Sequence, residues 1–90
     1  LDLEPQVAMQ AVFPNPASAI TCIPIQSDRA TRGALLLYDA LGRPVDTLYD
    51  GEIPAGEFRR FLFADRYPPG VYTLSLETAQ GRSAQKMVIR

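Results

Sequence analysis

The chain has no histidine, no tryptophan, one cysteine and one lysine among its 90 residues. Without histidine, the commonest general base and metal ligand is missing, and so is every Ser-His or Cys-His nucleophile pair. A lone thiol, Cys22, can form neither an internal disulfide nor a zinc site built from several thiolates. These absences exclude the common catalytic centres, and they predict a domain that is not an enzyme and uses no cofactor or metal.

Excess charge of one sign and long apolar runs are also lacking. Nine basic and ten acidic residues give a net charge of -1, whereas a protein that neutralises phosphates normally carries a basic excess. No apolar run approaches the roughly 18 residues that span a bilayer. We therefore expect no nucleic-acid partner, and contact with a membrane only through partner proteins. The chain begins at Leu1, without methionine or a signal peptide, so we expect it to be a piece of a longer protein.

The composition that is present indicates one small globular domain, with 47% hydrophobic and 21% charged residues. Eight prolines and six glycines leave no window of about 12 residues for an amphipathic helix. Short apolar stretches instead recur about every ten residues between turn signals. This pattern predicts an all-β fold, an immunoglobulin-like antiparallel β-sandwich of about seven strands. We expect residues 1–7 to be a linker and residues 8–90 to be the domain.

The turn signals divide the domain into strands and predict how some of them face. Asp39-Ala40-Leu41-Gly42 is a turn signal that should join the third and fourth strands as a hairpin, and Asp50-Gly51 should close the fourth. In the last strand, Met87 and Ile89 share one face, while Lys86, Val88 and Arg90 share the other. The charges predict an edge strand protected against unwanted pairing. The way the fifth strand faces does not follow from its sequence. The predicted strands are residues 8–13, 19–25, 34–38, 44–49, 57–63, 71–78 and 83–89.

Several polar residues permit a chemical role but have simpler structural explanations. Aspartates near strand ends could form a carboxylate pair for glycoside chemistry, but turn residues that bond their own backbone explain them better. No segment has the alternating acidic ligands of a calcium loop of the EF-hand type. Cys22 lies in an apolar strand and should be a buried, inert thiol. The aspartates are Asp39, Asp46, Asp50 and Asp65.

Carbohydrate binding is a further possibility for a small β-sandwich, but the flat tryptophan that sugar platforms favour is missing. Tyrosines could replace it, although a tyrosine on a strand usually belongs to the core and places its hydroxyl at the rim. We therefore retain a structural, adhesive or carbohydrate-binding module of a secreted enzyme as the alternative hypothesis. The tyrosines are Tyr38, Tyr49, Tyr67 and Tyr72.

Four motifs, taken in order, carry a family resemblance. Val12-Phe13-Pro14-Asn15-Pro16 is an extended element that the prolines stiffen, and Leu37-Tyr38-Asp39-Ala40-Leu41-Gly42-Arg43-Pro44-Val45 is the hairpin. Pro68-Pro69-Gly70-Val71-Tyr72 is a turn that leads into a strand, and Lys86-Met87-Val88-Ile89-Arg90 ends the chain. At this spacing they resemble the type A C-terminal sorting domains of type IX secretion substrates, which are immunoglobulin-like. The hairpin is also similar to flagellar-hook-scaffold-like immunoglobulin modules.

The resemblance implies that the domain is an address and that its motif residues form the sorting signal. It implies a cargo attached upstream, an outer-membrane translocon that recognises the domain, and a sortase-like peptidase that removes it. The cargo would then be joined to anionic lipopolysaccharide. The implied location is the periplasm in transit, then the cell surface or the medium. As a mechanism, we expect the terminal strand to pair with a receptor sheet by strand addition, with Lys86 and Arg90 supplying charge complementarity.

Overall fold

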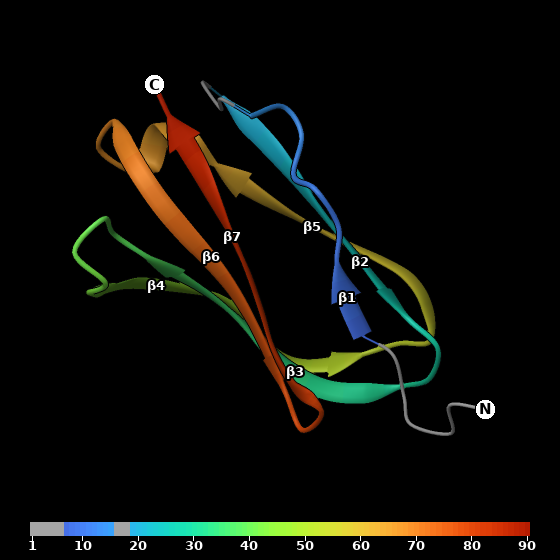
Figure 1. Cartoon of the computed structure of the whole chain (residues 1–90). Coiled ribbons are helices and arrows are strands. Elements are labelled where there is room, and N and C mark those ends of the chain that lie inside the picture. The colour runs from blue at the N-terminus through green and yellow to red at the C-terminus, as the bar shows by residue number, and fades with distance from the viewer. Residues whose placement is uncertain (1–6, 16–18) are drawn as a thin grey trace.

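The computed structural model describes residues 7–15 and 19–90, which form two antiparallel β-sheets stacked as a sandwich (Figure 1). The three-stranded sheet has the order β1-β2-β5, and the four-stranded sheet has the order β4-β3-β6-β7. The predicted all-β sandwich of seven strands is confirmed. The strands are β1 (Val7–Met9), β2 (Ile20–Ser27), β3 (Thr31–Tyr38), β4 (Pro44–Ile53), β5 (Gly56–Phe63), β6 (Gly70–Thr78) and β7 (Gly81–Ile89), and a 3-10 turn, η1 (Ala64–Arg66), links β5 to β6.

The core lies between the two sheets and follows from the alternation along each strand. Because successive side chains of a strand point to opposite faces, every second residue faces inward. Met87 and Ile89 are buried while Val88 between them is exposed, as the sequence predicts. Each large apolar side chain buried in this way contributes about 1.5–3 kcal/mol. Fully buried side chains include Ile23, Ile25, Leu35, Leu37, Ile53, Leu62, Leu74 and Leu76.

The first strand is shorter than the predicted 8–13. Val7 pairs with Ser27 at the start of β1, which ends at Met9. Beyond β1 the Gln10 N–H still donates to the Pro24 carbonyl of β2 (2.9 Å), and the chain next pairs with the sheet at Phe13, through an isolated bridge to Cys22. Between these points the Val12 N–H donates to the side-chain Oε1 of Gln85 in β7 (3.1 Å). The alternation predicts a continuous strand over residues 8–13. The strand is instead interrupted, because the Val12 N–H bonds Gln85 of the opposite sheet and not β2.

The fourth strand is longer than predicted. Asp50-Gly51 does not close it, and β4 continues to Ile53. Ile53 is fully buried, and its burial holds the end of the strand against the core. Gly51 lies opposite Gly33 in β3, so two residues without side chains face one another. The glycine is therefore part of the sheet, although its residue type is typical of a turn.

The structure also establishes how β5 faces. Leu62 points into the core, whereas Phe61 and Phe63 remain 54% and 43% exposed on the outer face. On the inner side, the Arg60 guanidinium lies 4.8 Å from the centre of the Tyr49 ring. This cation–π contact lets an arginine occupy a position that would ordinarily be apolar, and it leaves two aromatic side chains on the outside.

Candidate functional site

Three of the four sequence motifs come together on neighbouring strands of the four-stranded sheet. Tyr38 of β3 lies opposite Thr73 of β6, which lies opposite Lys86 of β7. Two residues further along β6 and β7, Val71 lies opposite Val88. These residues lie at one end of the sandwich, which we call the motif end. It comprises Asn15, Tyr38, Asp39, Leu41, Gly42, Arg43, Gly70, Val71, Tyr72, Lys86, Met87, Val88, Ile89 and Arg90.

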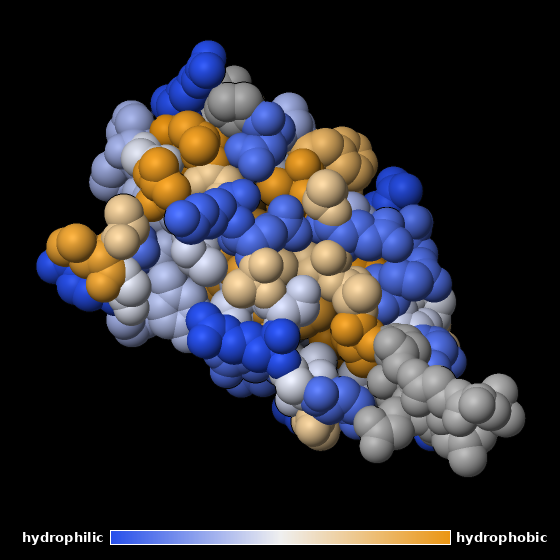
Figure 2. Space-filling model, in the orientation of Figure 1, coloured by the Kyte–Doolittle hydropathy of each residue, from blue (hydrophilic) through white to orange (hydrophobic). Residues whose placement is uncertain are grey.

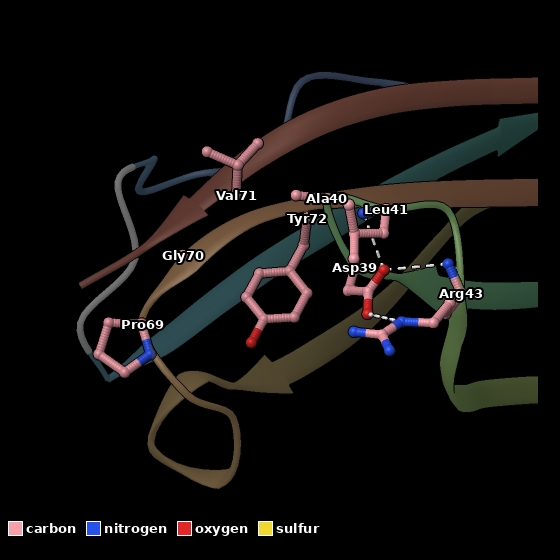
Figure 3. A pocket seen from close by; sticks show the side chains of 8 residues that line it. All are labelled: Asp39, Ala40, Leu41, Arg43, Pro69, Gly70, Val71 and Tyr72. Carbon is pink, nitrogen blue, oxygen red and sulfur yellow. Dashed lines mark hydrogen bonds and ion pairs between the residues drawn. The ribbon is translucent and has the colours of Figure 1, made fainter.

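The hairpin at the motif end is held by Asp39. Its carboxylate accepts hydrogen bonds from the backbone N–H of Leu41 (2.9 Å) and of Arg43 (3.0 Å), and from the Arg43 Nε (3.0 Å; Figure 3). Gly42 has φ 81°, a left-handed conformation that favours glycine. The predicted turn is confirmed, and its carboxylate is used structurally. These hydrogen bonds lower the pKa of Asp39 below its usual 3.8. The bond from the Arg43 N–H has the largest effect, followed by those from the Arg43 guanidinium and the Leu41 N–H.

This lowered pKa predicts an acid-dependent loss of stability. A depressed pKa in the folded state stabilises the fold above pH 3.8, and the contribution is lost as the pH falls through the folded value. We expect Asp39→Asn to destabilise the domain at neutral pH and to matter progressively less below pH 3.8. Urea unfolding of both proteins across this range measures the difference. A difference that stays constant with pH would contradict the role given to the carboxylate.

A shallow pocket of about 220 Å³ joins the hairpin to the motif that opens β6 (Figure 3). The Tyr72 hydroxyl donates to the Pro68 carbonyl (2.5 Å), which fixes the turn before β6. Leu41 is 77% exposed and Val71 is 45% exposed beside this pocket. Figure 2 shows apolar atoms at the tip of the β3–β4 hairpin and where β6 begins and β7 ends. Exposed apolar groups around a shallow pocket suit contact with a protein.

The fourth motif is tied to the terminal strand by a side-chain clasp. Asn15 Oδ1 accepts from the Val88 N–H (3.0 Å), and Asn15 Nδ2 donates to the Lys86 carbonyl (3.5 Å). Next to it, Gln85 Nε2 donates to the Gln10 carbonyl (2.7 Å). The two amide side chains bond the backbone as a neighbouring strand would. Pro14 accepts from the Thr21 hydroxyl (2.9 Å), and Pro16 lies outside the described residues.

The clasp bears on the hypothesis of strand addition at the terminal strand. As predicted, β7 lies at the edge of its sheet, and Lys86, Val88 and Arg90 face solvent. Its outer edge is nevertheless partly occupied, because Asn15 takes the Val88 N–H and the Lys86 carbonyl. A receptor strand would have to displace this side chain. Sequence reasoning singled out Asn15 but missed Gln85, whose only signal is an amide beside the closing motif.

Asp46, Asp50 and Cys22, which the sequence analysis also singled out, have structural surroundings in this fold. Asp46 accepts a hydrogen bond from the Tyr67 hydroxyl (2.7 Å), and Asp50 lies 4.0 Å from Arg32. Cys22 is buried, as expected of an inert thiol. Within residues 7–15 and 19–90, no group of three acidic or thiol side chains lies close enough to hold a metal ion. In the same part of the chain, no helix has the length and apolarity to cross a membrane.

The contact between Tyr67 and Asp46 predicts a response to alkali. Burial, followed by the hydrogen bond to Asp46, raises the pKa of Tyr67 from 10.0 to about 12. A raised pKa stabilises the fold below pH 10, and this contribution disappears as the pH rises toward 12. We expect Tyr67→Phe to remove one tyrosinate absorbance step near pH 12. The variant should also lose less stability than the wild type as the pH rises from 10 toward 12. An unchanged alkaline titration would contradict this assignment.

With the motif end described, comparison with known families identifies the chain. The family model for the secretion system C-terminal sorting domain matches residues 11–90, and the chain belongs to this family. It is a C-terminal sorting signal for type IX secretion. Searches of curated proteins and of solved structures found no significant match. Membership implies an attached cargo, interaction with the secretion machinery, and passage through the periplasm to the cell surface or the medium.

Proposed function

We propose that the motif end is the surface by which the outer-membrane translocon recognises the domain. A sortase-like peptidase then cuts upstream of the sandwich and attaches the cargo to the cell surface. The domain itself contributes recognition and no chemistry. The observation that carries this proposal is the convergence of motifs from opposite ends of the chain, with Asn15 bonded to Lys86 and Val88. Folding brings these residues together, so the folded domain presents them as one surface.

The composition of the motif end supports a protein partner. Val71 and Val88 lie opposite one another and are exposed, and Val71 lines the same pocket as Leu41 at the apolar hairpin tip. Arg43 and Lys86 border them with positive charge, and the Arg43 side chain is largely exposed even though it pairs with Asp39. An apolar centre with a charged rim is typical of protein interfaces. The matching surface of the translocon would be apolar and bordered by acidic groups.

A reporter fusion tests the proposal. A reporter with an N-terminal signal peptide is joined to residues 1–90 and expressed in a bacterium that has the type IX system and in a mutant that lacks it. We expect the reporter on the surface or in the medium only in the first strain. It should be shorter than the fusion by about the length of the domain. If the reporter stays in the periplasm while an established sorting domain exports the same reporter, the proposal fails. If the uncut fusion is exported, cleavage by the peptidase is contradicted.

A further inference from the structure

The edges of the two sheets differ in how open they are to a further strand. The β7 edge is clasped by Asn15. The β4 edge is irregular, since the β3–β4 register shifts beside Leu36 and again beside Tyr38, and β4 begins with a proline. Bulges and proline are devices that discourage strand pairing at an edge. In the part of the chain that the structure describes, β1 has three residues, whereas β5 pairs with β2 along all eight of its residues without a shift. The edge of β5 is therefore the regular one.

The backbone of β5 offers hydrogen-bonding groups at this edge. In an antiparallel ladder, both backbone groups of a residue point to the same side, and successive residues alternate. Cys22 bonds Phe13 on the side of β2 away from β5. Its partner across the ladder, Phe61, therefore directs its N–H and C=O away from β2. By the same alternation, so do Glu57, Arg59 and Phe63, and the four residues form the free side of the strand.

An apolar strip runs beside the free edge. Phe61 and Phe63 are exposed on the outer face of the three-stranded sheet. Ile20 lies opposite Phe63, and Phe13 is bridged to Cys22 opposite Phe61, so all of these side chains share that face. Ile20 and Phe13 are exposed as well. Contiguous exposed aromatic and aliphatic groups on a small domain mark a surface for contact with another molecule.

The charges available beside this strip are positive. A gap of about 220 Å³ between β5 and β4 is lined by Arg60, Arg66 and Asp46, among others. The Arg60 Nε is buried without a hydrogen-bond partner, and among the described residues neither Arg60 nor Arg66 forms an ion pair. Asp46, the one carboxylate lining the gap, accepts from the Tyr67 hydroxyl. The surroundings supply two cations that lack a carboxylate partner.

We propose that the free edge of β5 binds an extended segment of a partner protein, which adds as an outer strand of the three-stranded sheet. Its apolar side chains lie on Phe61 and Phe63, and its acidic side chains reach Arg60 and Arg66. A second copy of the chain fits less well, because its β5 carries only Glu57 as an acid, which is already paired with Arg59 (3.1 Å). This binding goes beyond recognition at the motif end and does not depend on it.

Titration of the isotope-labelled domain with a synthetic peptide tests the inference. The peptide has the length of β5, alternates valine and glutamate, and is blocked at both ends. We expect saturable amide shifts centred on Arg59, Phe61 and Phe63, with a Kd below about 1 mM. The double variant Phe61→Thr/Phe63→Thr keeps β-forming residues at exposed positions and should bind at least about tenfold more weakly. Val45→Thr, on the exposed β4 edge, should bind like the wild type.

The same titration has clear contrary outcomes. The inference is overturned if shifts centre on β4 or β7, if binding is absent up to about 1 mM, or if a peptide with lysine in place of glutamate binds equally well. Self-association that the double variant abolishes would assign the edge to a second copy instead. If the double variant unfolds, slowed amide exchange at Phe61 and Phe63 of the wild type on adding peptide decides the question. Export is not measured here, so failure would leave the sorting function untouched.

Discussion

Reversing the charges of Lys86 and Arg90 together is expected to reduce export of an attached cargo by about tenfold or more. Both residues are exposed on the terminal strand. Met87 and Ile89, which hold this strand in the core, are unchanged, so the domain should remain folded. Each reversal replaces an attraction to the translocon with a repulsion. Fractionation of cells that carry the reporter fusion measures the effect, and urea unfolding of the purified variant checks the fold.

The matched control is the pair Arg29→Glu/Arg32→Glu, which changes the net charge equally. Arg32 lies near the start of β3, whereas the motif residue Tyr38 ends that strand. The ion pair of Arg32 with Asp50 is long, at 4.0 Å, and both side chains are well exposed. Losing it should therefore change the stability of the domain little. If both pairs reduce export equally, the effect reflects overall charge. If the terminal pair exports normally, the charges of the last strand have no part in recognition.

Removing the clasp with Asn15→Ala is expected to lower the free energy of unfolding by about 0.5–1.5 kcal/mol, because both of its hydrogen bonds are exposed to solvent. The substitution leaves the Val88 N–H and the Lys86 carbonyl without their partner. It should also free the end of β7, so the Val88 amide should exchange with solvent much faster. Denaturant unfolding and amide exchange measure the two effects.

Asn15→Asp separates the two halves of the clasp. It keeps an acceptor for the Val88 N–H but loses the donor to the Lys86 carbonyl. Because the bond to Val88 is the shorter, at 3.0 Å against 3.5 Å, most of the stability should be retained. Equal losses in both variants would show that the acceptor contributes little. An unchanged Val88 exchange rate in Asn15→Ala would contradict the clasp altogether.

Much of the fold could be predicted because period-two alternation reports burial directly. In β7 the residues from Ser83 to Ile89 alternate in burial, and Asp39 with Gly42 carries the local chemistry of a hairpin turn. The failures arise from contacts between distant residues. Val12 leaves the sheet for Gln85, which lies 73 positions away. The facing of β5 depends on the stacking of Arg60 over Tyr49, which no local pattern contains.

For the candidate site too, local features could be predicted from the sequence and contacts between distant residues could not. The motif residues could be found from the sequence, because prolines, turn residues and alternating strands have local signatures. Their convergence could not, because it depends on the register that sets Val71 opposite Val88. The clasp was also hidden, since Asn15 and Lys86 are 71 positions apart. Sequence reasoning therefore identified the motif residues, and the fold brings them together at one end of the sandwich.

The most direct test of that surface is export of a reporter joined to the variant Leu41→Ser/Val71→Ser. Both side chains are exposed beside the same pocket, so the substitutions should lower the free energy of unfolding by no more than about 1 kcal/mol. The fraction of reporter outside the cell is compared with that of the wild-type fusion. The account predicts that the wild-type fusion is exported and that the folded variant stays in the periplasm. Export of the folded variant at the wild-type level would contradict it.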